Sequence, residues 1–516
     1  MSGPTTTGIS QASERCIGSG TQRVRLPSLT ALVFLLPVLL LYWQVGGPSG
    51  LLADPSTGVH VRTGQWILAH HGVPKRDLFS FTMPNRRWCD WEWGSDAIFT
   101  AVYRLNGLSA VAALALLLMC LVSVVVYRTA RLYAGPVAAA TTCALVMATT
   151  TIHWLARPHP FTWLGIAALC WVLESHAWNR RVWLLPVAMV LWVNLHPGFV
   201  AGFVVIGTWL AGAWFNQRFI SAKEERRHWR RESKWYAMAL VLCGLSTLAN
   251  PYFFQLNRHI ASYLFAPSTV IAHVSEWLSP DFHNPRLAWF ELLLPLAAAT
   301  GVWHGLKQRF QWCFLIFAFM HLALFSVRNV PLFAIVCAAP VAAAAEEVLP
   351  KLDFWRYVRE AEEVAKGGRR ATITLALWGL GFAAILSVSV SPVRLGAGSH
   401  IPVTAIRRLP PGRVFTTDQW ADYLIYAQPG RRVFFDGRND FYGRAFVQTY
   451  LRILKAERGW QAALIHYHVS VILVPERSSL SVALDYASDW RTLYRDAGAL
   501  VYVKQESMAR TRETGR

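Results

Sequence analysis

Residues 109–126 read SAVAALALLLMCLVSVVV, a stretch without a charged residue, glycine or proline. About 20 consecutive apolar residues allow a helix to cross the hydrocarbon core of a bilayer. Similar stretches recur as far as residue 390, and the whole chain is 54% hydrophobic and only 16% charged. This composition excludes an ordinary soluble protein and predicts a mainly α-helical, polytopic membrane protein.

Counting these stretches gives about 11 transmembrane helices of roughly the length that a bilayer requires. They make residues 29–390 a transmembrane domain, with a large first loop at residues 46–107, an N-terminal segment at 1–28 and a tail at 391–516. The expected helices lie near Leu29–Val45, Ser109–Val126, Pro136–Leu155, Trp163–Ala177, Val182–Val193, Phe199–Phe215, Trp235–Leu248, Leu287–Val302, Gln311–Phe325, Val330–Ala345 and Thr372–Val390.

Basic residues indicate which side of the membrane each loop occupies, because short cytoplasmic loops carry an excess of lysine and arginine. Such residues precede the first expected helix and follow the second, fourth, sixth, eighth and tenth. This alternation places the N-terminus in the cytoplasm, and loop 46–107 and the tail outside. The net charge of +20 comes largely from these loops and from an arginine-rich tail. The expected partner is therefore the lipid bilayer and not a nucleic acid.

The tail, residues 391–516, predicts a soluble α/β domain. Short apolar runs that alternate with helical stretches favour a small sheet covered by helices. The expected strands are Arg413–Thr416, Arg432–Phe435, Val469–Val474 and Leu500–Val503. Asp436-Gly437-Arg438 follows the second of these, and polar residues at the carboxyl edge of a buried strand commonly face a ligand crevice. The alternative is that Asp436 and Arg438 bond to each other and brace a turn.

Polar residues gather in the loops assigned to the outer side. The first loop carries three carboxylates that could serve as a base, Asp54, Asp77 and Glu92. Ionisable groups at membrane depth are costly and usually mark a pathway or a site. Ordinary polar helix ends are the alternative for any one loop. The later outer loops carry Arg157, His159, Asn194, His196, Asn250, Glu276 and Arg328.

The order of residues in the first loop is similar to a known pattern. Asp54 follows the first span, and behind it come His60, Gly64, Trp66-Ile67, Gly72, Pro74, Asp77, Phe79-Ser80-Phe81, Trp88 and Trp91-Glu92-Trp93. This loop resembles that of GT-C glycosyltransferases such as lipid A aminoarabinose transferases and protein O-mannosyltransferases, which place an essential carboxylate just after the first span. Nearly the whole chain more closely resembles a group of bacterial membrane proteins without an assigned activity, also at Asn194-x-His196-x-Gly198, Asn250-Pro251, Glu276-Trp277 and Asp436-Gly437-Arg438.

The resemblance implies a transferase of the bacterial cytoplasmic (inner) membrane that moves a sugar from a polyprenyl-phosphate donor to an extracytoplasmic glycan, lipid or protein. Asp54 takes the place of the family's carboxylate, with Asp77 and Glu92 as further catalytic candidates. An arginine fork at Arg157 or Arg328 suits phosphate oxygens. The other candidates for substrate binding are His60, Trp88, Trp91, Trp93, His159, Asn194, His196, Asn250, Glu276, Asp436 and Arg438. An interfacial aromatic belt is the alternative for the tryptophans.

Pro55 stands where many GT-C enzymes have a second acidic residue, which leaves a divalent metal ion open as a cofactor. The sequence contains no phosphate-binding loop, dinucleotide fingerprint or nucleophile elbow, so a nucleotide-sugar donor is not expected. We expect an inverting transfer in which one carboxylate activates the acceptor. Two other functions stay open at this point: a carrier or flippase for a lipid-linked glycan, and an assembly component for such glycans.

Overall fold

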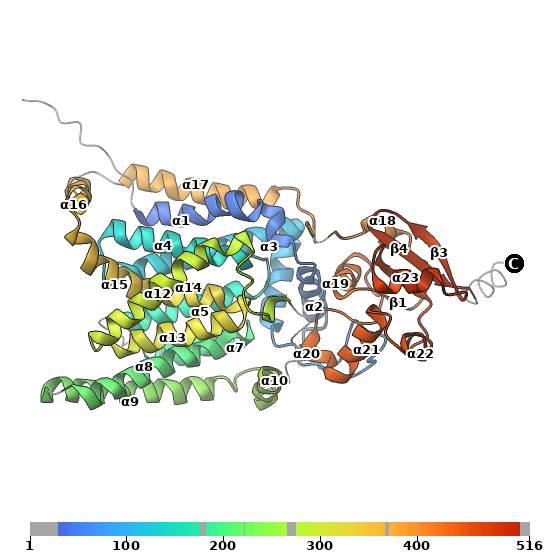
Figure 1. The fold of residues 1–516 in the computed structure, drawn as a ribbon, viewed down its shortest axis with the longest axis horizontal. Coiled ribbons are helices and arrows are strands. Elements are labelled where there is room, and N and C mark those ends of the chain that lie inside the picture. The colour runs from blue at the N-terminus through green and yellow to red at the C-terminus, as the bar shows by residue number, and fades with distance from the viewer. Residues whose placement is uncertain are drawn as a thin grey trace, which may run out of the picture.

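The computed structural model describes residues 29–175, 182–220, 222–265, 275–366, 371–398 and 400–505. Figure 1 shows an elongated molecule with a helical body at one end and a smaller α/β tail at the other. Helix α2 (Ser56–His70) lies between the two parts. The N-terminal segment 1–28, predicted to be cytoplasmic, lies outside the described residues.

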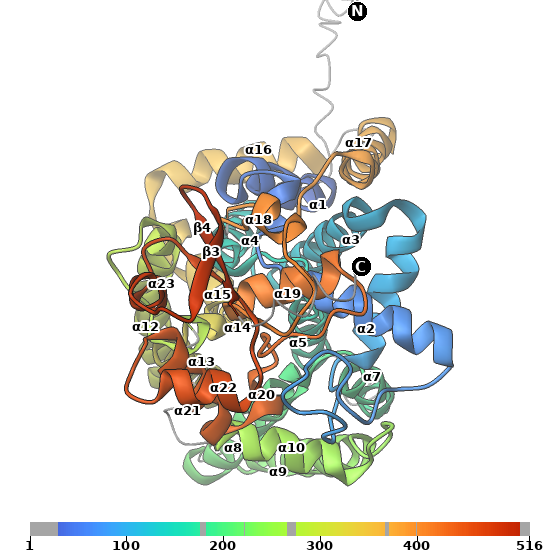
Figure 2. The same ribbon diagram turned by 90° about the vertical axis from the view of Figure 1, so that its right-hand side faces the viewer.

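The body consists of helices that form from the apolar stretches of the sequence. Viewed from the tail, these helices lie behind the sheet and helices of the tail (Figure 2). Their bounds are α1 (Leu29–Leu40), α3 (Trp93–Ala130), α4 (Pro136–Thr150), α5 (His159–Glu174), α7 (Leu184–Val193), α8 (Val200–Phe219), α9 (Lys223–Ser246), α10 (Phe254–Leu264), α12 (Ala288–Leu306), α13 (Phe310–Phe325), α14 (Val330–Val336), α15 (Ala338–Val348), α16 (Asp353–Lys366) and α17 (Ala371–Val390). Short helical turns lie at Leu41–Val45, Pro48–Leu52, Thr151–His153, Pro197–Phe199, Ser275–Trp277, Pro285–Leu287, Val327–Asn329 and Leu349–Lys351.

Several helices have the length and composition of membrane spans. Within the described residues, four pass this test, at Trp93–Ala130, Pro136–His153, Pro197–Phe219 and Pro285–Leu306. The pair Val327–Val336 and Ala338–Lys351 is bent by 50° and adds one broken span if the two are counted together. Shorter apolar helices lie at Leu29–Val45, Leu184–Val193, Phe310–Phe325 and Thr374–Val390. The chain is therefore a mainly helical membrane protein, and its exact number of spans stays a prediction.

Helix α3 begins at Trp93, well before the start expected near Ser109. The end of loop 46–107 is therefore helical. Asn106 and Gly107 interrupt the helical backbone, and Gly107 has a φ of 62°, which glycine adopts without a steric penalty. The kink joins a first segment that faces the tail to a long apolar segment inside the body.

Helix α2 packs closely on both sides, and two glycines make this approach possible. At Gly58 an added Cβ would lie 2.5 Å from the Cβ of Tyr426 in the tail. At Gly64 it would lie 2.0 Å from the backbone oxygen of Asp96 in α3. Both distances are too short for a side chain, so glycine allows the backbones to meet. Helix α2 is thus fixed against the body and the tail at once.

The tail is a four-stranded sheet in the order β1-β2-β4-β3, in which β1 and β2 are parallel and the other neighbours antiparallel. The segment expected as a strand at Arg432–Phe435 forms single bridges only, from Val433 to Val414 and to Ser80 of the first loop. The strands are β1 (Val414–Phe415), β2 (Val471–Pro475), β3 (Trp490–Arg495) and β4 (Ala499–Lys504). The helices are α18 (Val403–Arg407), α19 (Asp418–Ala427), α20 (Asn439–Tyr442), α21 (Arg444–Leu454), α22 (Trp460–His466) and α23 (Ser479–Asp485).

The first loop completes the core of the tail. Phe79, Phe81 and Trp88 pack with one apolar cluster of the tail, and Val59 of α2 belongs to the other. Backbone hydrogen bonds from Phe81 to Val433 and from Val433 to Phe79 add the loop to the edge of the sheet. The first loop and the tail therefore share one core. The segment that follows Asp54 thus packs against the C-terminal part of the chain.

Candidate functional site

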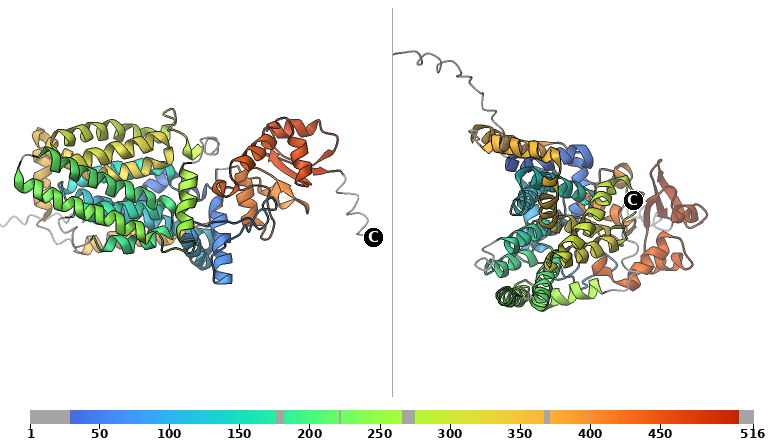
Figure 3. Two further views of the ribbon diagram at one scale, coloured as in Figure 1. Left: turned by 90° about the horizontal axis from the view of Figure 1, so that it is seen from below. Right: turned by 60° about the vertical axis from the view of Figure 1, so that its left-hand side comes forward.

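Ionisable side chains from several separate connections meet at the end of the body that faces the tail. Figure 3 shows this end from below, with α2 and the first loop between the helices and the tail. Asp54 precedes α2, Glu92 precedes α3, Arg157 precedes α5, His196 precedes α8, and Arg328 precedes α14. The sequence predicted that such residues gather on one side, and the fold brings these into a single cluster.

Arg157 is the centre of the cluster. Its Nη1 donates to Oδ2 of Asp54 at 2.9 Å and to Oε1 of Glu276 at 3.0 Å. The three side chains are 22–25% exposed, so each is partly accessible to solvent. Within the described residues, Nη2 and Nε of Arg157 have no hydrogen-bond partner. An arginine carries five N–H donors in a planar fork, so most of this fork stays available while the two carboxylates hold its orientation.

Electrostatic interactions favour the charged forms of Glu276 and Arg157. Burial alone would raise the pKa of Glu276, but Arg157, His153 and Arg328 together lower it to about 2. Burial would likewise lower the pKa of Arg157, but Glu276 and Asp54 raise it above its usual value. At neutral pH the cluster therefore contains one guanidinium between two carboxylates.

Arg328 adds a second positive charge. Its guanidinium carbon lies 4.6 Å from the ring centre of Trp277, a cation–π contact that leaves the N–H edge free. Among the described residues no carboxylate forms an ion pair with Arg328. Its charge nevertheless acts on two carboxylates: it helps to lower the pKa of Glu276, and it opposes part of the increase that burial causes in the pKa of Glu92. Arg157 and Arg328 thus share one electrostatic environment.

A chain of hydrogen bonds orients His196 toward Glu92. Trp192 donates its indole N–H to Thr162 Oγ1 at 2.9 Å, and Thr162 Oγ1 lies 2.8 Å from His196 Nδ1. Gly198 donates its backbone N–H to the same Nδ1 at 2.9 Å. Nδ1 is therefore an acceptor, and a neutral imidazole carries its proton on Nε2. This Nε2 lies 3.3 Å from Oε1 of Glu92.

The second oxygen of Glu92 is held less tightly. Oε2 lies 4.0 Å from His60 Nε2, while His60 Nδ1 binds Asp96 Oδ1 at 2.7 Å. Burial raises the pKa of Glu92, although His60 and Arg157 counteract part of the increase. Burial also lowers the pKa of His60, which keeps the imidazole neutral near pH 7. Because burial raises its pKa, Glu92 takes up a proton more readily than an exposed carboxylate, which suits proton exchange.

The cluster does not fit a metal ion as it is arranged. Across the described ranges, no group of three or more His, Cys, Asp or Glu side chains could hold one. The guanidinium of Arg157 occupies the place between Asp54 and Glu276, and its charge would repel a cation there. Pro55 adds no further carboxylate.

Other residues predicted for substrate binding surround this cluster. His159 is buried, with Nε2 2.9 Å from the backbone oxygen of His153. Asn194 accepts from Trp93 Nε1 at 2.9 Å and donates to the backbone of Ala249 at 2.8 Å. Asn250 bonds to the backbone of its own turn. The ring of Trp91 packs against His259 and Tyr263. These contacts fix the loops that carry the charged residues.

A second arginine cluster lies apart from Asp54, where the first loop meets the tail. Arg438 donates from Nη2 to Asp77 at 2.8 Å, and from Nε and Nη2 to Asp436 at 2.8 and 2.7 Å. Its guanidinium carbon lies 4.5 Å from the ring centre of Trp88. Asp436 is fully buried and Trp88 is 8% exposed. This packing matches the bracing interpretation, and we leave these four residues out of the proposed site.

Sequence reasoning missed two residues of the cluster. Thr162 lies within an apolar stretch, where a threonine gives no signal of its own. His153 Nε2 lies 4.0 Å from Glu276 Oε2, and His153 precedes Arg157 by four positions in the same connection. Its place next to Arg157 was the one signal that could have identified it.

No protein-family model and no curated protein matches the sequence. The fold is similar to that of the oligosaccharyltransferase AglB from the archaeon Archaeoglobus fulgidus in complex with an inhibitory peptide and a dolichol-phosphate. That match has a TM-score of 0.58 and 13% identity, and covers 93% of this chain and 74% of the other. The Archaeoglobus fulgidus enzyme tethered to an acceptor peptide with an NVT sequon matches with a TM-score of 0.56 and 13% identity, over 92% and 73% of the two chains.

The chain shares the GT-C fold of these enzymes. The predicted resemblance to GT-C glycosyltransferases is thereby confirmed at the level of the fold, and the resemblance to a group of bacterial membrane proteins stays a prediction. At 13% identity the likeness concerns the fold alone.

Proposed function

We propose that this chain is a membrane glycosyltransferase that moves a sugar from a polyprenyl-phosphate-linked donor to an extracytoplasmic acceptor. The observation that carries this proposal is the geometry of Arg157, whose two carboxylates share a single nitrogen and leave the rest of the fork open. The proposed setting is a bacterial cytoplasmic membrane, with the first loop and the tail outside. The acceptor is a glycan, a lipid or a protein.

Arg157 and Arg328 would bind the phosphate of the donor. Arginine forks match phosphate oxygens and stabilise the charge that develops when the phosphate leaves. Asp54 and Glu276 would hold Arg157 in position and touch the phosphate only through it. The proposed role of Asp54 is thus one of positioning, where the sequence favoured it as the base.

Glu92 would accept the proton of the acceptor. In the proposed step, an acceptor oxygen or nitrogen attacks the anomeric carbon, its proton passes to Oε2 of Glu92, and the bond between that carbon and the lipid phosphate breaks. His196 would hold Oε1 through its Nε2 proton, which leaves Oε2 directed toward the acceptor. No metal ion takes part in this scheme.

The similar solved structures support this class of reaction. One is a complex with dolichol-phosphate, a lipid carrier, and another carries a tethered acceptor peptide. A carrier or flippase would need the lipid-linked sugar to cross the membrane without a chemical step.

Mass spectrometry of lipid-linked sugars and of surface glycans and proteins, in cells with and without this chain, tests the proposal. We expect cells without the chain to lose one sugar-modified acceptor and to accumulate the donor lipid. Glu92→Gln should produce the same phenotype at an unchanged protein level. A modified acceptor that persists in Glu92→Gln cells but disappears without the chain would favour a carrier.

A further inference from the structure

A separate group of arginines lies at the amino edge of the tail sheet. Val433 pairs in parallel with Val414, so the residues before them, Arg432 and Arg413, lie at the same edge. Asp436 lies at the opposite end of this segment, about 13 Å away along an extended chain. The arginine group therefore faces away from the brace formed by Arg438.

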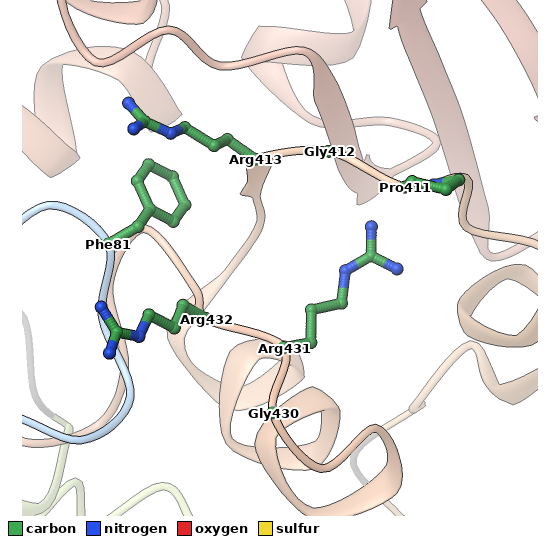
Figure 4. Close-up of a pocket in the computed structure, with 7 residues that line it drawn as sticks. All are labelled: Phe81, Pro411, Gly412, Arg413, Gly430, Arg431 and Arg432. Atoms are coloured by element: carbon green, nitrogen blue, oxygen red, sulfur yellow. The ribbon is translucent and has the colours of Figure 1, made fainter. Parts of the chain in front are cut away.

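A cavity of about 380 Å³ opens at this edge. Small-molecule sites typically measure about 300–1,000 Å³. Arg413 and Arg432 lie on either side of Phe81, and Arg431 points toward the turn before β1 (Figure 4). The lining residues include no carboxylate and are Phe81, Pro411, Gly412, Arg413, Gly430, Arg431 and Arg432.

Two glycine turns and one anchored arginine shape the cavity. Gly412 has a φ of 138° and Gly430 a φ of 86°, conformations that residues with a side chain rarely adopt. Arg431 donates from Nη1 to Oε1 of Gln428 at 2.9 Å and from Nη2 to the backbone oxygen of Pro410. Both acceptors are uncharged, so they hold the guanidinium in place without neutralising it.

The other two arginines also lack a carboxylate partner among the described residues. Arg413 donates from Nη1 to the backbone oxygen of Tyr467 at 3.1 Å, and its guanidinium carbon lies 5.4 Å from the ring centre of Phe81. Arg432 is exposed. In the part of the chain that the structure describes, neither of them nor Arg431 forms an ion pair with a carboxylate. The three arginines line one cavity without a carboxylate, so an anion bound there would be attracted by their positive charge.

We propose that this cavity binds an anionic saccharide through Arg413, Arg431 and Arg432. The guanidinium forks would hold a carboxylate or a phosphate on the sugar, because both groups fit this planar geometry. The rings of Phe81 and Pro411 offer apolar surface for the C–H face of a sugar unit. Binding here does not depend on the proposed transfer reaction.

Isothermal titration calorimetry on the purified full chain, at low ionic strength, tests this site with three probes. Trigalacturonate carries carboxylates, glucose 6-phosphate carries a phosphate, and maltotriose is uncharged. We expect binding of an anionic probe and none of maltotriose, and the tighter anionic probe identifies the charged group. Arg432→Glu should weaken this binding by about tenfold or more, as expected when a hydrogen bond to a charged group is lost.

The matched control is Arg477→Glu. Arg477 is exposed and follows β2, at the opposite edge of the sheet from the cavity, and its substitution changes the net charge equally. The affinity of the Arg477→Glu variant for the anionic probes should stay close to that of the unmodified chain. Arg413→Gln, which keeps a donor for Tyr467 but removes the charge, should weaken binding in the same direction as Arg432→Glu.

Three results would overturn the site. Equal affinities in Arg432→Glu and Arg477→Glu would show that binding occurs elsewhere. If maltotriose binds as tightly as trigalacturonate, the negative charge of the saccharide does not determine binding. Association with nanodiscs of anionic phospholipid, together with no binding of either anionic sugar, would identify the arginines as a membrane-contact surface.

Discussion

Two arginines of this protein each lie between two carboxylates, but their surroundings differ. Arg157 reaches both of its carboxylates through a single nitrogen, and its side chain is 25% exposed. Arg438 uses two nitrogens, its side chain is 10% exposed, and the rings of Phe79, Trp88 and Phe441 surround it. The first arrangement leaves donors for a ligand, and the second leaves no room for one.

The comparison shows that the same set of charges can serve chemistry or folding. A buried ion pair is strongly destabilising to break, because the remaining charge stays in a poorly solvating environment. A partly exposed pair can exchange one partner for a ligand oxygen at a smaller cost. Exposure thus separates the proposed site from the brace, because Nη1 of Arg438 also has no hydrogen-bond partner among the described residues but is buried, whereas Arg157 is partly exposed.

The largest effect is expected at Glu92, in the cluster around Arg157. Glu92→Gln removes the proposed base, and a positioned base typically contributes about 10² to 10⁴ in rate. We expect transfer in a reconstituted assay to fall by that factor while the melting temperature stays nearly unchanged. Glu291→Gln is the control, because Glu291 is an exposed glutamate in the first turn of α12.

The variant Asp54→Asn tests whether the base is Glu92 and not Asp54. Glu276 would still hold Arg157 in that variant, so a smaller loss is expected, seen mainly as a higher KM for the donor. Because burial raises the pKa of Glu92, the unmodified enzyme should lose activity as pH falls through that raised value. A loss in Asp54→Asn as large as in Glu92→Gln, in kcat and with a changed pH profile, would return the role of base to Asp54.

The second largest effect is expected on stability, in the cluster formed by Arg438, Asp77 and Asp436. Arg438→Met leaves Asp436 and Asp77 buried without their cation, which typically costs about 3–5 kcal/mol. Thermal unfolding of the full chain should show the loss, and limited proteolysis should begin between the first loop and the tail. The matched variant Arg444→Met, at an exposed position of α21, should behave like the unmodified chain. An unchanged melting temperature in Arg438→Met would show that the cluster does not brace the fold.

The sequence predicted the features that depend on local pattern. Apolar stretches gave the helices of the body, and polar residues at the outer loops gave the members of the charged cluster. Strand β3 was missed because most residues of Trp490–Arg495 are exposed and its two arginines interrupt the apolar pattern. The early start of α3 was missed because Asn106-Gly107 is typical of a turn, and here it marks a kink inside one helix.

Long-range pairing could not be predicted in the same way. Asp77 and Arg438 are 361 positions apart, and no periodicity links them. The sequence therefore grouped Asp77 with Asp54, its neighbour in the loop. The bonds of Arg157 to Asp54 and Glu276 likewise depend on how three connections meet in space, although each residue was a candidate.

A smaller effect should appear in the pH dependence of stability. The pKa of Glu276 lies at about 2 in the folded chain, below its usual value of 4.5. A carboxyl group whose pKa is lowered by folding stabilises the folded state above its unfolded pKa, and this contribution disappears as pH falls through the folded pKa. The melting temperatures of the unmodified chain and Glu276→Gln should differ most above pH 4.5 and converge toward pH 2. A constant difference over this range would show that Glu276 is not paired with Arg157 in solution.

The smallest effect is expected from removing metal ions, and this experiment tests whether the cluster around Arg157 acts without a metal ion. In the structure a guanidinium, and not a cation site, separates Asp54 from Glu276. Arg157 then supplies the positive charge that the donor phosphate needs, so treatment with EDTA should leave transfer unchanged. If EDTA abolishes transfer and Mg²⁺ or Mn²⁺ restores it, the carboxylates must release Arg157 to bind an ion. The variant Arg157→Ala separates the two cases, because it should be inactive at any metal concentration if the guanidinium binds the phosphate, and rescued by added metal if it only fills an ion's place.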